Sequence, residues 1–222
     1  MPTLDLYTFA ISPPCRAVIS TAQILGVDFN EKHLELFKGE HLTEDFLKLN
    51  PHHKVPLLVD EDYTLGESRA IQIYLFNKYA KPESDYLYPK DIQKRGKVDW
   101  LLYFDSATLF PNALAFFKAY KFQGRKPNEE ETKTLIDTLD LVDKNYFQNS
   151  DFLFGDKPSL ADISFAASLS FLDMINFDFS KWERISKFLS ASRNTAWFKK
   201  GPALYNEMSE EWRNSIKEKG LI

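Results

Sequence analysis

The sequence has little of several residue types that define whole classes of protein. It contains one cysteine, Cys15, so it forms no intramolecular disulfide and no zinc or iron–sulfur site built from several cysteines. Basic residues number 28 against 32 acidic ones, and no dense basic run occurs, which argues against a nucleic-acid partner. The longest uncharged apolar stretch, residues 163–172, is well short of the roughly 20 residues that span a bilayer, so no membrane partner is expected.

No secretory signal is visible in the first residues, so a cytoplasmic location is the simplest expectation. What is present is ordinary for a globular protein: 44% of the residues are hydrophobic and 27% are charged, which is too apolar for a disordered chain. The length of 222 residues suits one large domain or two small ones.

Residues 1–80 alternate short strand patterns with helical ones. Strands are expected at residues 4–8, 27–36, 55–59 and 63–65, and helices at 13–25, 43–49 and 68–79. Pro13 and Pro14 suit the first turn of the first helix, where a missing N–H is no loss, and Gly26 ends that helix. The order β-α-β-α-β-β-α predicts an α/β domain.

The rest of the chain is expected to be helical. A segment at residues 81–88, polar and helix-breaking at its start, is expected to be a linker. The expected helices are 91–118, 129–147, 159–176, 182–192 and 202–217. Residues 89–222 would therefore form a second, all-α domain.

Ser12 lies between the first strand and the first helix, where a helix N-terminus stabilises an anion. Ser12-x-x-Cys15 has the spacing of the Cys-x-x-Cys motif of thioredoxin-like proteins, with serine in place of the attacking cysteine. A serine forms no disulfide, so thiol exchange is disfavoured, but its hydroxyl can donate to a thiolate that a ligand brings. Either Ser12 serves such a ligand, or it only caps the helix. Cys15 falls inside the helix and is expected to be buried rather than reactive.

Two further segments carry groups suited to a small peptide. Pro56 opens a strand, and a cis bond before it would free the backbone N–H and C=O of Val55, although a plain strand start also explains the proline. The strands expected at 55–59 and 63–65, joined by the acidic turn 60–62, predict an antiparallel hairpin. Glu67, Ser68 and Arg69 follow it, where Glu67 can hold an ammonium, Ser68 can cap the helix and Arg69 can hold a carboxylate. The alternative is a capped, solvated helix start.

Five motifs, taken in order, resemble the cytosolic glutathione transferases, most closely the insect delta class, with the epsilon class next. They are SPPCRA at 12–17, FKGEH at 37–41, FLKLNPHHKVP at 46–56, ESRAI at 67–71 and SLAD at 159–162. The resemblance covers essentially the whole chain. It implies a thioredoxin-like domain in residues 1–80, a linker at 81–88 and a helical domain at 89–222, which together make the glutathione transferase fold.

The resemblance also implies a role for individual residues. Ser12 matches the serine that hydrogen-bonds the sulfur of glutathione. Residues that match glutathione contacts are His41 and His53 at the glycine end, Val55 and cis-Pro56 at the cysteinyl group, and Glu67, Ser68 and Arg69 at the γ-glutamyl end. Ser159 and Asp162 match a capping box that supports folding. Glutathione would be a co-substrate, with no prosthetic group and no metal, and the protein would be a homodimer.

Thiol chemistry explains why a hydroxyl donor would matter. A free thiol has a pKa near 8.5, so only a few per cent is thiolate at neutral pH. Lowering that pKa by about two units takes roughly 2.7 kcal/mol, which one charge-assisted hydrogen bond and a helix N-terminus together supply. The thiolate would then attack an apolar electrophile, the detoxifying conjugation that the family carries out. A carrier of hydrophobic ligands, or a glutathione-dependent peroxidase or isomerase, is the alternative.

The apolar substrate is expected to lie against the helix at 91–118. The resemblance to the delta class implies that the residues lining its site are Ser106, Phe110 and Phe117. An aromatic stripe on a helix is also typical of a core, and residues 113–118 depart from the tyrosine-rich segment common in the delta class. Three residues near the end of the chain either close this pocket or pack on the core: Tyr205, Met208 and Trp212.

Overall fold

Four short strands form one mixed sheet in the computed structural model, which describes residues 4–147, 150–199 and 203–222. The strands are β1 (Leu4–Thr8), β2 (Phe29–His33), β3 (Leu57–Asp60) and β4 (Tyr63–Leu65), in the order β2-β1-β3-β4. β1 runs parallel to β2 and antiparallel to β3, and β3 and β4 form a hairpin. Alternate residues of β1 are buried, as expected for a strand with one face on a core.

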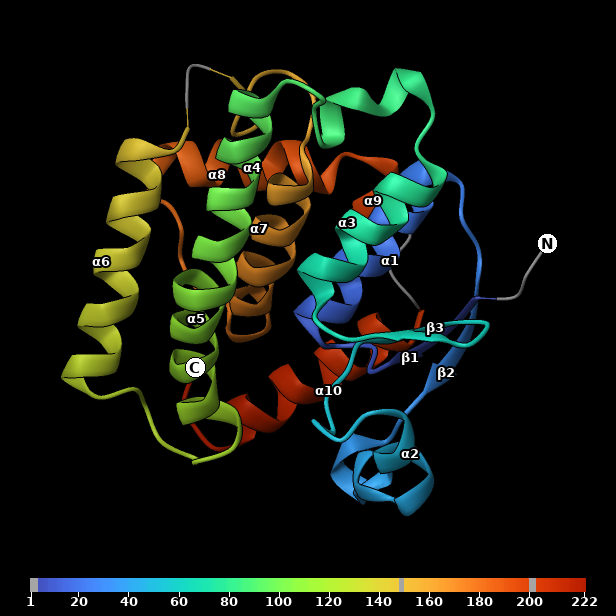
Figure 1. The fold of residues 1–222 in the computed structure, drawn as a ribbon. Coiled ribbons are helices and arrows are strands. Elements are labelled where there is room, and N and C mark those ends of the chain that lie inside the picture. The colour runs from blue at the N-terminus through green and yellow to red at the C-terminus, as the bar shows by residue number, and fades with distance from the viewer. Residues whose placement is uncertain (1–3, 148–149, 200–202) are drawn as a thin grey trace.

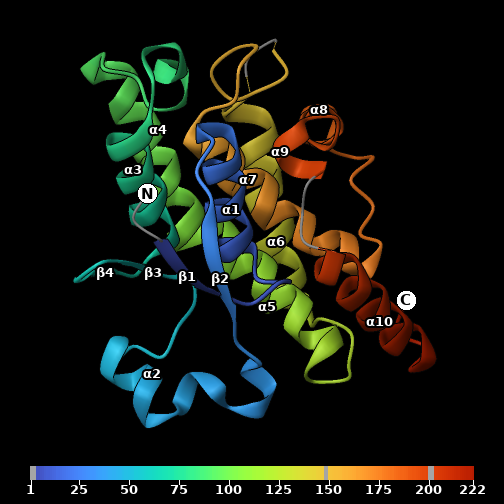
Figure 2. The same ribbon diagram turned by 90° about the vertical axis from the view of Figure 1, so that its right-hand side faces the viewer.

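Two helices cover one face of this sheet, and a third lies on its other side (Figures 1 and 2). The covering helices are α1 (Pro13–Leu25) and α3 (Ser68–Tyr79), and the third is α2 (Glu44–Leu49). Gly26 ends α1 in the left-handed conformation, with φ of 69°, which glycine adopts without strain. Two 3₁₀ turns, Leu36–Lys38 and Glu40–Leu42, lie between β2 and α2.

The second part of the described chain is helical. Its elements are a 3₁₀ segment (Pro82–Leu87), α4 (Ile92–Phe104), a π-helical turn (Asp105–Leu109), α5 (Phe110–Lys121), α6 (Glu129–Asn145), α7 (Leu160–Ser170), a 3₁₀ segment (Phe171–Ile175), α8 (Glu183–Arg193), α9 (Ala196–Lys199) and α10 (Ala203–Glu218). Every residue of α7 is buried, so this helix forms the centre of the larger core.

The expected fold class is confirmed, with local differences. β2 covers only residues 29–33 of the expected 27–36, and all of its residues are partly or fully exposed. The helix expected at 91–118 is interrupted by the π-helical turn at 105–109. The helix expected at 159–176 changes to 3₁₀ after Ser170, and α9 was not expected. No helix among the described residues combines the length and the apolarity needed to cross a membrane.

Buried hydrogen bonds join the two parts of the chain where α1 and α3 meet α7. The Gln72 side chain donates to the Thr21 hydroxyl at 2.9 Å and accepts from the Ser164 hydroxyl at 2.8 Å. Arg16 donates to the Ser170 hydroxyl at 2.9 Å. Because buried polar groups are costly unless they are paired, this network fixes how α3 is seated on α7.

The capping box expected at Ser159 and Asp162 is present at the start of α7. The Asp162 carboxylate accepts from the Ser159 backbone N–H and from the Leu153 N–H, each at 2.7 Å. Burial nevertheless raises the pKa of Asp162 to about 6, against the lowering effect of these hydrogen bonds. The contacts are structural and lie outside the site described next.

Candidate active site

Four segments leave the sheet at one end, and they carry the residues expected to bind a ligand. Tyr7, near the end of β1, pairs with Leu57 at the start of β3, and Thr8 pairs with the last residue of β2. The loops that contain Ser12, residues 34–42 and residues 53–56 therefore meet at this end, and β4 pairs with β3 just beside it. The topology thus gathers residues that are far apart in the sequence.

Ser12 is the N-cap residue of α1, but its side chain makes no capping hydrogen bond. Its backbone N–H donates to Phe9 and its carbonyl accepts from the Arg16 N–H, so the main chain holds it on both sides. Pro13 and Pro14 carry no N–H, which removes two of the free donors that a helix N-terminus usually presents. The Ser12 hydroxyl, which also contacts the Cys15 thiol, is therefore a donor that this end of α1 can turn to an incoming anion.

Cys15 is fully buried, in the first turn of α1. Burial raises the pKa of its thiol to about 11, although a hydrogen bond with the Ser12 side chain acts in the opposite direction. A thiol with this pKa stays protonated at neutral pH and is a poor nucleophile. The prediction that Cys15 is buried is confirmed.

The Val55–Pro56 peptide bond is cis, as the resemblance implied. Val55 is half-buried and Pro56 is buried at the start of β3. Two residues before Val55, His53 has a φ of 46°, and its ring centroid lies 6.2 Å from that of His41. A positive φ is unfavourable for a residue other than glycine, so the surrounding structure must impose it on His53. Such residues cluster at functional sites.

Glu67, rather than Ser68, is the N-cap residue of α3. Like His53, Glu67 has a positive φ, of 64°. Its side chain makes no capping hydrogen bond. Ser68 is instead the first residue of α3 and is buried. The first turn of α3 therefore keeps free N–H groups next to the exposed Glu67 carboxylate, a pairing suited to a molecule that carries both a carboxylate and an ammonium.

Arg69 is occupied by protein groups. Its Nε donates to the Asp105 carboxylate at 3.1 Å, one terminal nitrogen donates to the same oxygen, and the other donates to the Ser68 hydroxyl at 2.8 Å. Its guanidinium also lies over the Phe110 ring, 5.7 Å from the centroid. Arg69 thus orients Ser68 and links α3 to the π-helical turn that follows α4.

Two buried polar atoms in this region have no hydrogen-bond partner among the described residues. They are Nδ1 of His41 and Oδ1 of Asp105. A buried polar atom without a partner costs about 1–3 kcal/mol, so such atoms are rare in folded proteins. One belongs to the loop after β2 and the other lies beside Arg69 and the start of α3. A ligand that offered a donor to Oδ1 of Asp105 and a hydrogen-bond partner to Nδ1 of His41, which donates or accepts according to its tautomer, would satisfy both.

The three residues expected to line an apolar site differ in exposure. Ser106 is exposed on the π-helical turn and Phe110 is half-buried beneath Arg69. Phe117 is fully buried between the Phe171 ring, whose centroid is 4.2 Å away, and the Trp212 ring, which stacks on it with centroids 5.6 Å apart. Met208 is half-buried against the core, and the side chain of Tyr205 lies outside the described residues.

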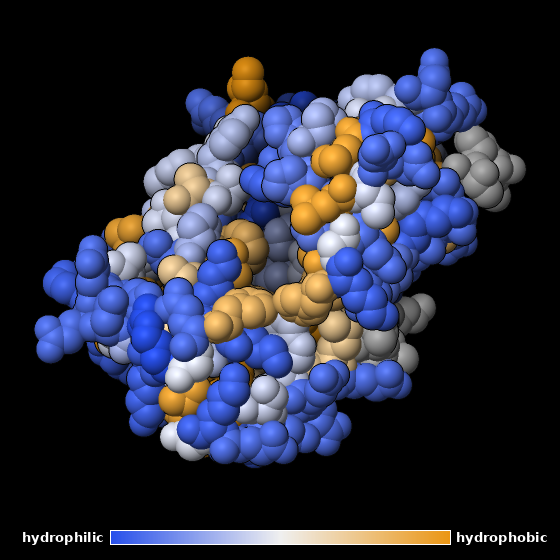
Figure 3. Space-filling model, turned by 90° about the horizontal axis from the view of Figure 1, so that it is seen from below, coloured by the Kyte–Doolittle hydropathy of each residue, from blue (hydrophilic) through white to orange (hydrophobic). Residues whose placement is uncertain are grey.

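Trp212 is covered in turn by two exposed rings. The centroids of Phe37 and Phe122 each lie 5.6 Å from that of Trp212 and 5.9 Å from each other. We call these three residues the aromatic bracket. It joins the loop after β2, the end of α5 and α10. The face that contains these elements is hollowed near its middle, and apolar residues form part of the rim (Figure 3).

Asp105 was missed as a site residue, although the sequence carries a signal for it. Val98, Leu101, Leu102 and Leu109 are buried at helical spacing, and Asp105 falls on the same face. A single acid on an otherwise apolar face requires a buried cationic partner, which is Arg69. Among the described residues, no three histidine, cysteine, aspartate or glutamate side chains come together as a metal site would need.

Known protein families and solved structures resemble this chain in sequence and fold. Residues 6–83 match the glutathione S-transferase N-terminal domain family, and residues 127–206 match the C-terminal domain family. A delta-class glutathione transferase from Nilaparvata lugens is 36% identical, with a TM-score of 0.84 over 97% of this chain and 99% of that one. A glutathione transferase homolog from Drosophila mojavensis, solved with bound glutathione, is 32% identical, with a TM-score of 0.86 over 99% and 98%. An epsilon-class enzyme from the housefly, Musca domestica, is 30% identical, with a TM-score of 0.85 over 99% of both chains.

Proposed function

Because the chain belongs to the glutathione S-transferase family, a family of enzymes, we propose that it joins glutathione to apolar electrophiles and that the Ser12 hydroxyl stabilises the glutathione thiolate. The observation that carries this proposal is the state of Ser12. Its side chain makes no capping bond, and two prolines remove the neighbouring N–H donors. One hydrogen bond to a charged group contributes about 1.5–3 kcal/mol, which is about one to two units of thiol pKa.

The peptide is proposed to lie along the end of the sheet. Its γ-glutamyl carboxylate would meet the free N–H groups at the start of α3 and the Ser68 hydroxyl, and its ammonium would pair with Glu67 and the free oxygen of Asp105. The cysteinyl group would pair with the backbone of Val55, before cis-Pro56. The glycine carboxylate would lie near His41 and His53, whose rings are neighbours. Arg69 would act through Ser68 rather than as a direct clamp.

We assign the delta class to this chain because it has Glu67-Ser68-Arg69 where epsilon members tend to have Asp-Ser-His. The domain division at residues 81–88 follows from the same proposal: residues 1–80 would bind glutathione, and residues 89–222 would supply Ser106 and Phe110 to the electrophile. Trp212 covers Phe117, which would therefore support the pocket from behind. A buried free thiol at Cys15 suits the reducing cytoplasm, where we place the protein.

A homodimer is proposed as the working state. Helix α4 exposes large apolar side chains, with Ile92 at 81%, Trp100 at 57% and Tyr103 at 75% of their full surface. Exposed apolar groups concentrated on one element are typical of an interface. Tyr103→Glu should shift the protein to a monomer in sedimentation experiments, and an unchanged molecular mass would exclude this face.

The test of catalysis compares wild type with Ser12→Ala in the conjugation of 1-chloro-2,4-dinitrobenzene, with glutathione binding measured on both by calorimetry. We expect kcat to fall by about ten- to a hundredfold while the Kd for glutathione changes little, because the hydrogen bond favours the thiolate. Ser20→Ala, on the same helix but bonded to a backbone carbonyl instead, should retain full activity. Equal losses in binding and turnover would overturn the role of Ser12. Tight binding without turnover in wild type would instead indicate a carrier.

A further inference from the structure

The last residue of α5, Lys121, packs against the aromatic bracket. Its ammonium lies over the Trp212 ring, 4.7 Å from the centroid, and the residue is half-buried. Lysine side chains usually keep the ammonium in bulk water while the stem covers apolar surface. This lysine instead brings a positive charge onto the rings of the bracket.

No carboxylate neutralises this charge within the part of the chain that the structure describes, because Lys121 forms no ion pair there. Burial lowers the pKa of Lys121 from its ordinary value of 10.5. The Glu211 carboxylate acts against this lowering, and the Lys219 ammonium adds to it. Partial burial and a like charge both disfavour the ammonium, so an anion brought beside it would offset their cost.

A series of contacts connects the bracket to Ser12. The Ser12 backbone N–H donates to the Phe9 carbonyl at 2.9 Å, and the Phe9 ring lies 5.5 Å from that of Phe37. Phe37 in turn lies 5.6 Å from Trp212, the ring that carries the Lys121 ammonium. An elongated electrophile whose reacting carbon meets the sulfur beside Ser12 can therefore lie across these rings and bring its other end to Lys121.

Helix geometry places Lys121 in line with a residue proposed to contact the electrophile. At 100° per residue, Lys121 falls within about 20° of Phe110 around α5, and at 1.5 Å per residue it lies about 16 Å farther along the axis. Phe110 lies under Arg69, at the glutathione end of this helix face. Lys121 is therefore at the end of the same face that is remote from the reacting sulfur.

We propose that the protein prefers electrophiles that carry an acid group at the end away from the reacting carbon, and that Lys121 is the specificity-determining residue that recognises this acid. This preference rests on the proposed transferase function and adds a substrate class to it, elongated apolar electrophiles with a carboxylate at one end. With a chloronitroaryl substrate, the C–S bond forms, the C–Cl bond breaks, chloride leaves with the bonding electron pair, and the proton of the thiol passes to solvent. Lys121 takes no part in these bond changes.

The test uses two electrophiles that differ in charge alone, N-(4-chloro-3-nitrobenzoyl)-6-aminohexanoic acid and its primary amide. Five methylene groups separate the acid from the ring, so the reactivity of the ring itself is the same in both. The kcat/KM of wild type should be about fivefold higher for the acid, chiefly through a lower KM, as expected for one ammonium–carboxylate pair that is partly screened by water.

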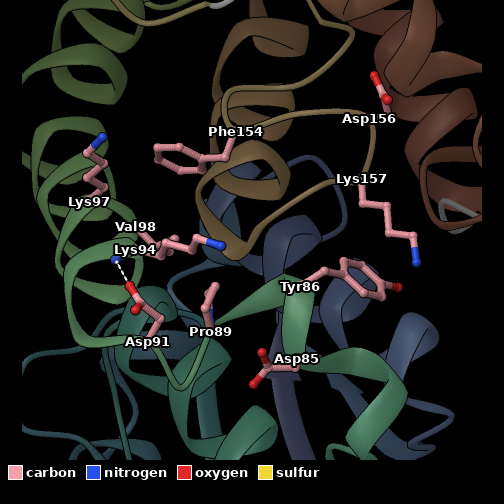
Figure 4. A pocket seen from close by; sticks show the side chains of 10 residues that line it. All are labelled: Asp85, Tyr86, Pro89, Asp91, Lys94, Lys97, Val98, Phe154, Asp156 and Lys157. Carbon is pink, nitrogen blue, oxygen red and sulfur yellow. Dashed lines mark hydrogen bonds between the residues drawn. The ribbon is translucent and has the colours of Figure 1, made fainter.

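Lys121→Gln should lower kcat/KM for the acid by about fivefold and leave the values for the amide and for 1-chloro-2,4-dinitrobenzene unchanged. Lys121→Arg, which keeps the charge, should keep the preference. Lys118→Gln should also keep it, because it removes a charge from an exposed position three residues earlier on α5. The same holds for Lys94→Gln, which removes a lysine that lines a cavity at the start of α4 (Figure 4).

Equal losses for the acid and the amide in Lys121→Gln would mean that the lysine only supports the Trp212 ring, and the proposal would be overturned. It would also be overturned by a wild type that does not prefer the acid. If the preference were lost in Lys94→Gln and kept in Lys121→Gln, the acid would bind in the other cavity, again contrary to the proposal.

Binding of the two glutathione conjugates, prepared without enzyme, separates this proposal from the transferase function. In calorimetry, wild type should bind the conjugate of the acid about fivefold more tightly than the conjugate of the amide, and Lys121→Gln should bind both alike. A wild type with no turnover of any of the electrophiles would refute the transferase function. The calorimetric preference would then still decide whether Lys121 recognises the acid.

Discussion

Arg69 donates two of its hydrogen bonds to Asp105, which comes from the helical part of the chain and has no exposed surface. The pair connects the start of α3, where the γ-glutamyl end of glutathione is proposed to bind, to the π-helical turn beside Phe110. Extra-residue turns of this kind are frequent at functional sites, and this one directs an acid from an apolar helix face toward Arg69. The pair therefore couples the two proposed substrate sites.

Asp105→Asn tests that coupling. The amide keeps the volume and one acceptor but removes the charge that partners Arg69, so we expect a loss of about 1.5–3 kcal/mol of unfolding free energy. The KM for glutathione should rise by about tenfold, with a smaller change for the electrophile. Urea unfolding and steady-state kinetics measure the two effects. Asp99→Asn, on the preceding helix α4 and bonded to Tyr88, should leave the glutathione KM unchanged. Equal KM shifts for both substrates in Asp105→Asn would show a general loss of structure instead.

The Cys15 thiol should resist modification in the native protein. Its pKa is raised to about 11 by burial, so almost none of it is thiolate at about pH 8, and the side chain has no exposed surface. Native protein treated with a disulfide reagent such as 5,5′-dithiobis(2-nitrobenzoate) should release almost no colour, whereas denatured protein should release one equivalent, from its single cysteine. Rapid labelling of the native form would show that α1 opens locally.

Gln72 should contribute to stability out of proportion to its size. It is fully buried, and Gln72→Leu removes the partner of the Ser164 hydroxyl and one partner of Thr21. Each buried group left without a partner costs about 1–3 kcal/mol, so we expect a total loss of about 2–4 kcal/mol in urea unfolding. The matched substitution Gln93→Leu, at an exposed position on α4, should change the unfolding free energy by less than about 0.5 kcal/mol. Similar effects from the two variants would show that the network adds nothing.

The pH dependence of stability should carry the signature of Asp60 and Lys78. Burial alone would raise the pKa of Asp60, but hydrogen bonds from Lys78 and Tyr74 hold it below its ordinary value of 3.8. The pKa of Lys78 is raised above 10.5, chiefly by its hydrogen bond to Asp60. A carboxyl group whose pKa is lowered in the folded protein stabilises the fold at pH values above its unfolded pKa, and this stabilisation is lost on acidification. A lysine whose pKa is raised in the folded protein stabilises the fold at pH values below its unfolded pKa, and this stabilisation is lost in alkali.

The stabilisation from this pair is therefore complete between about pH 4 and about pH 10. Lys78→Met should lower the unfolding free energy throughout that window, and the difference from wild type should shrink as the pH falls below about 4. Chemical denaturation at a series of pH values measures this. A difference that stays constant into acid would mean that packing of the lysine stem, rather than the pair, is what the variant loses.

The sequence predicts the frame of the fold well because its signals are local. Pro13, Pro14 and Gly26 mark both ends of α1, and the hairpin of β3 and β4 is visible from its acidic turn. The π-helical turn at 105–109 leaves no such mark, since its residues would also suit an α-helix. Glu67 takes the N-cap position that was expected for Ser68, because the tertiary structure holds it at positive φ.

The site was harder to predict than the fold, for a physical reason. Whether Ser12 caps its helix or stays available depends on the direction of one side chain, which the local sequence does not determine. The pairing of Arg69 with Asp105 is a long-range contact across 36 residues. Phe117 has the same pattern as any pocket residue on a helix, and only the positions of Phe171 and Trp212, much later in the chain, show that it is covered.

The aromatic bracket should control access to the apolar side of the site. Phe37 and Phe122 are 59% and 50% exposed, yet they help to cover Trp212, which is only 5% exposed and itself covers Phe117. The Lys121 ammonium also lies over the Trp212 ring, 4.7 Å from its centroid. Aromatic pairs contribute about 0.5–1.5 kcal/mol each beyond the area they bury. Phe37→Ala removes two such pairs of the bracket, with Trp212 and with Phe122, and so about 1–3 kcal/mol in total.

We therefore expect Phe37→Ala to loosen Trp212, to increase quenching of tryptophan fluorescence by acrylamide, and to change the KM for bulky electrophiles several-fold while the Kd for glutathione stays the same. Leu42→Ala is the control, because Leu42 is equally exposed in the same loop but is outside the bracket. If Trp212 packs on the core and takes no part in substrate access, quenching will increase with no change in any KM. If the bracket controls substrate access, acrylamide quenching and the KM for the electrophile will both change, and the KM will change most for the largest substrates.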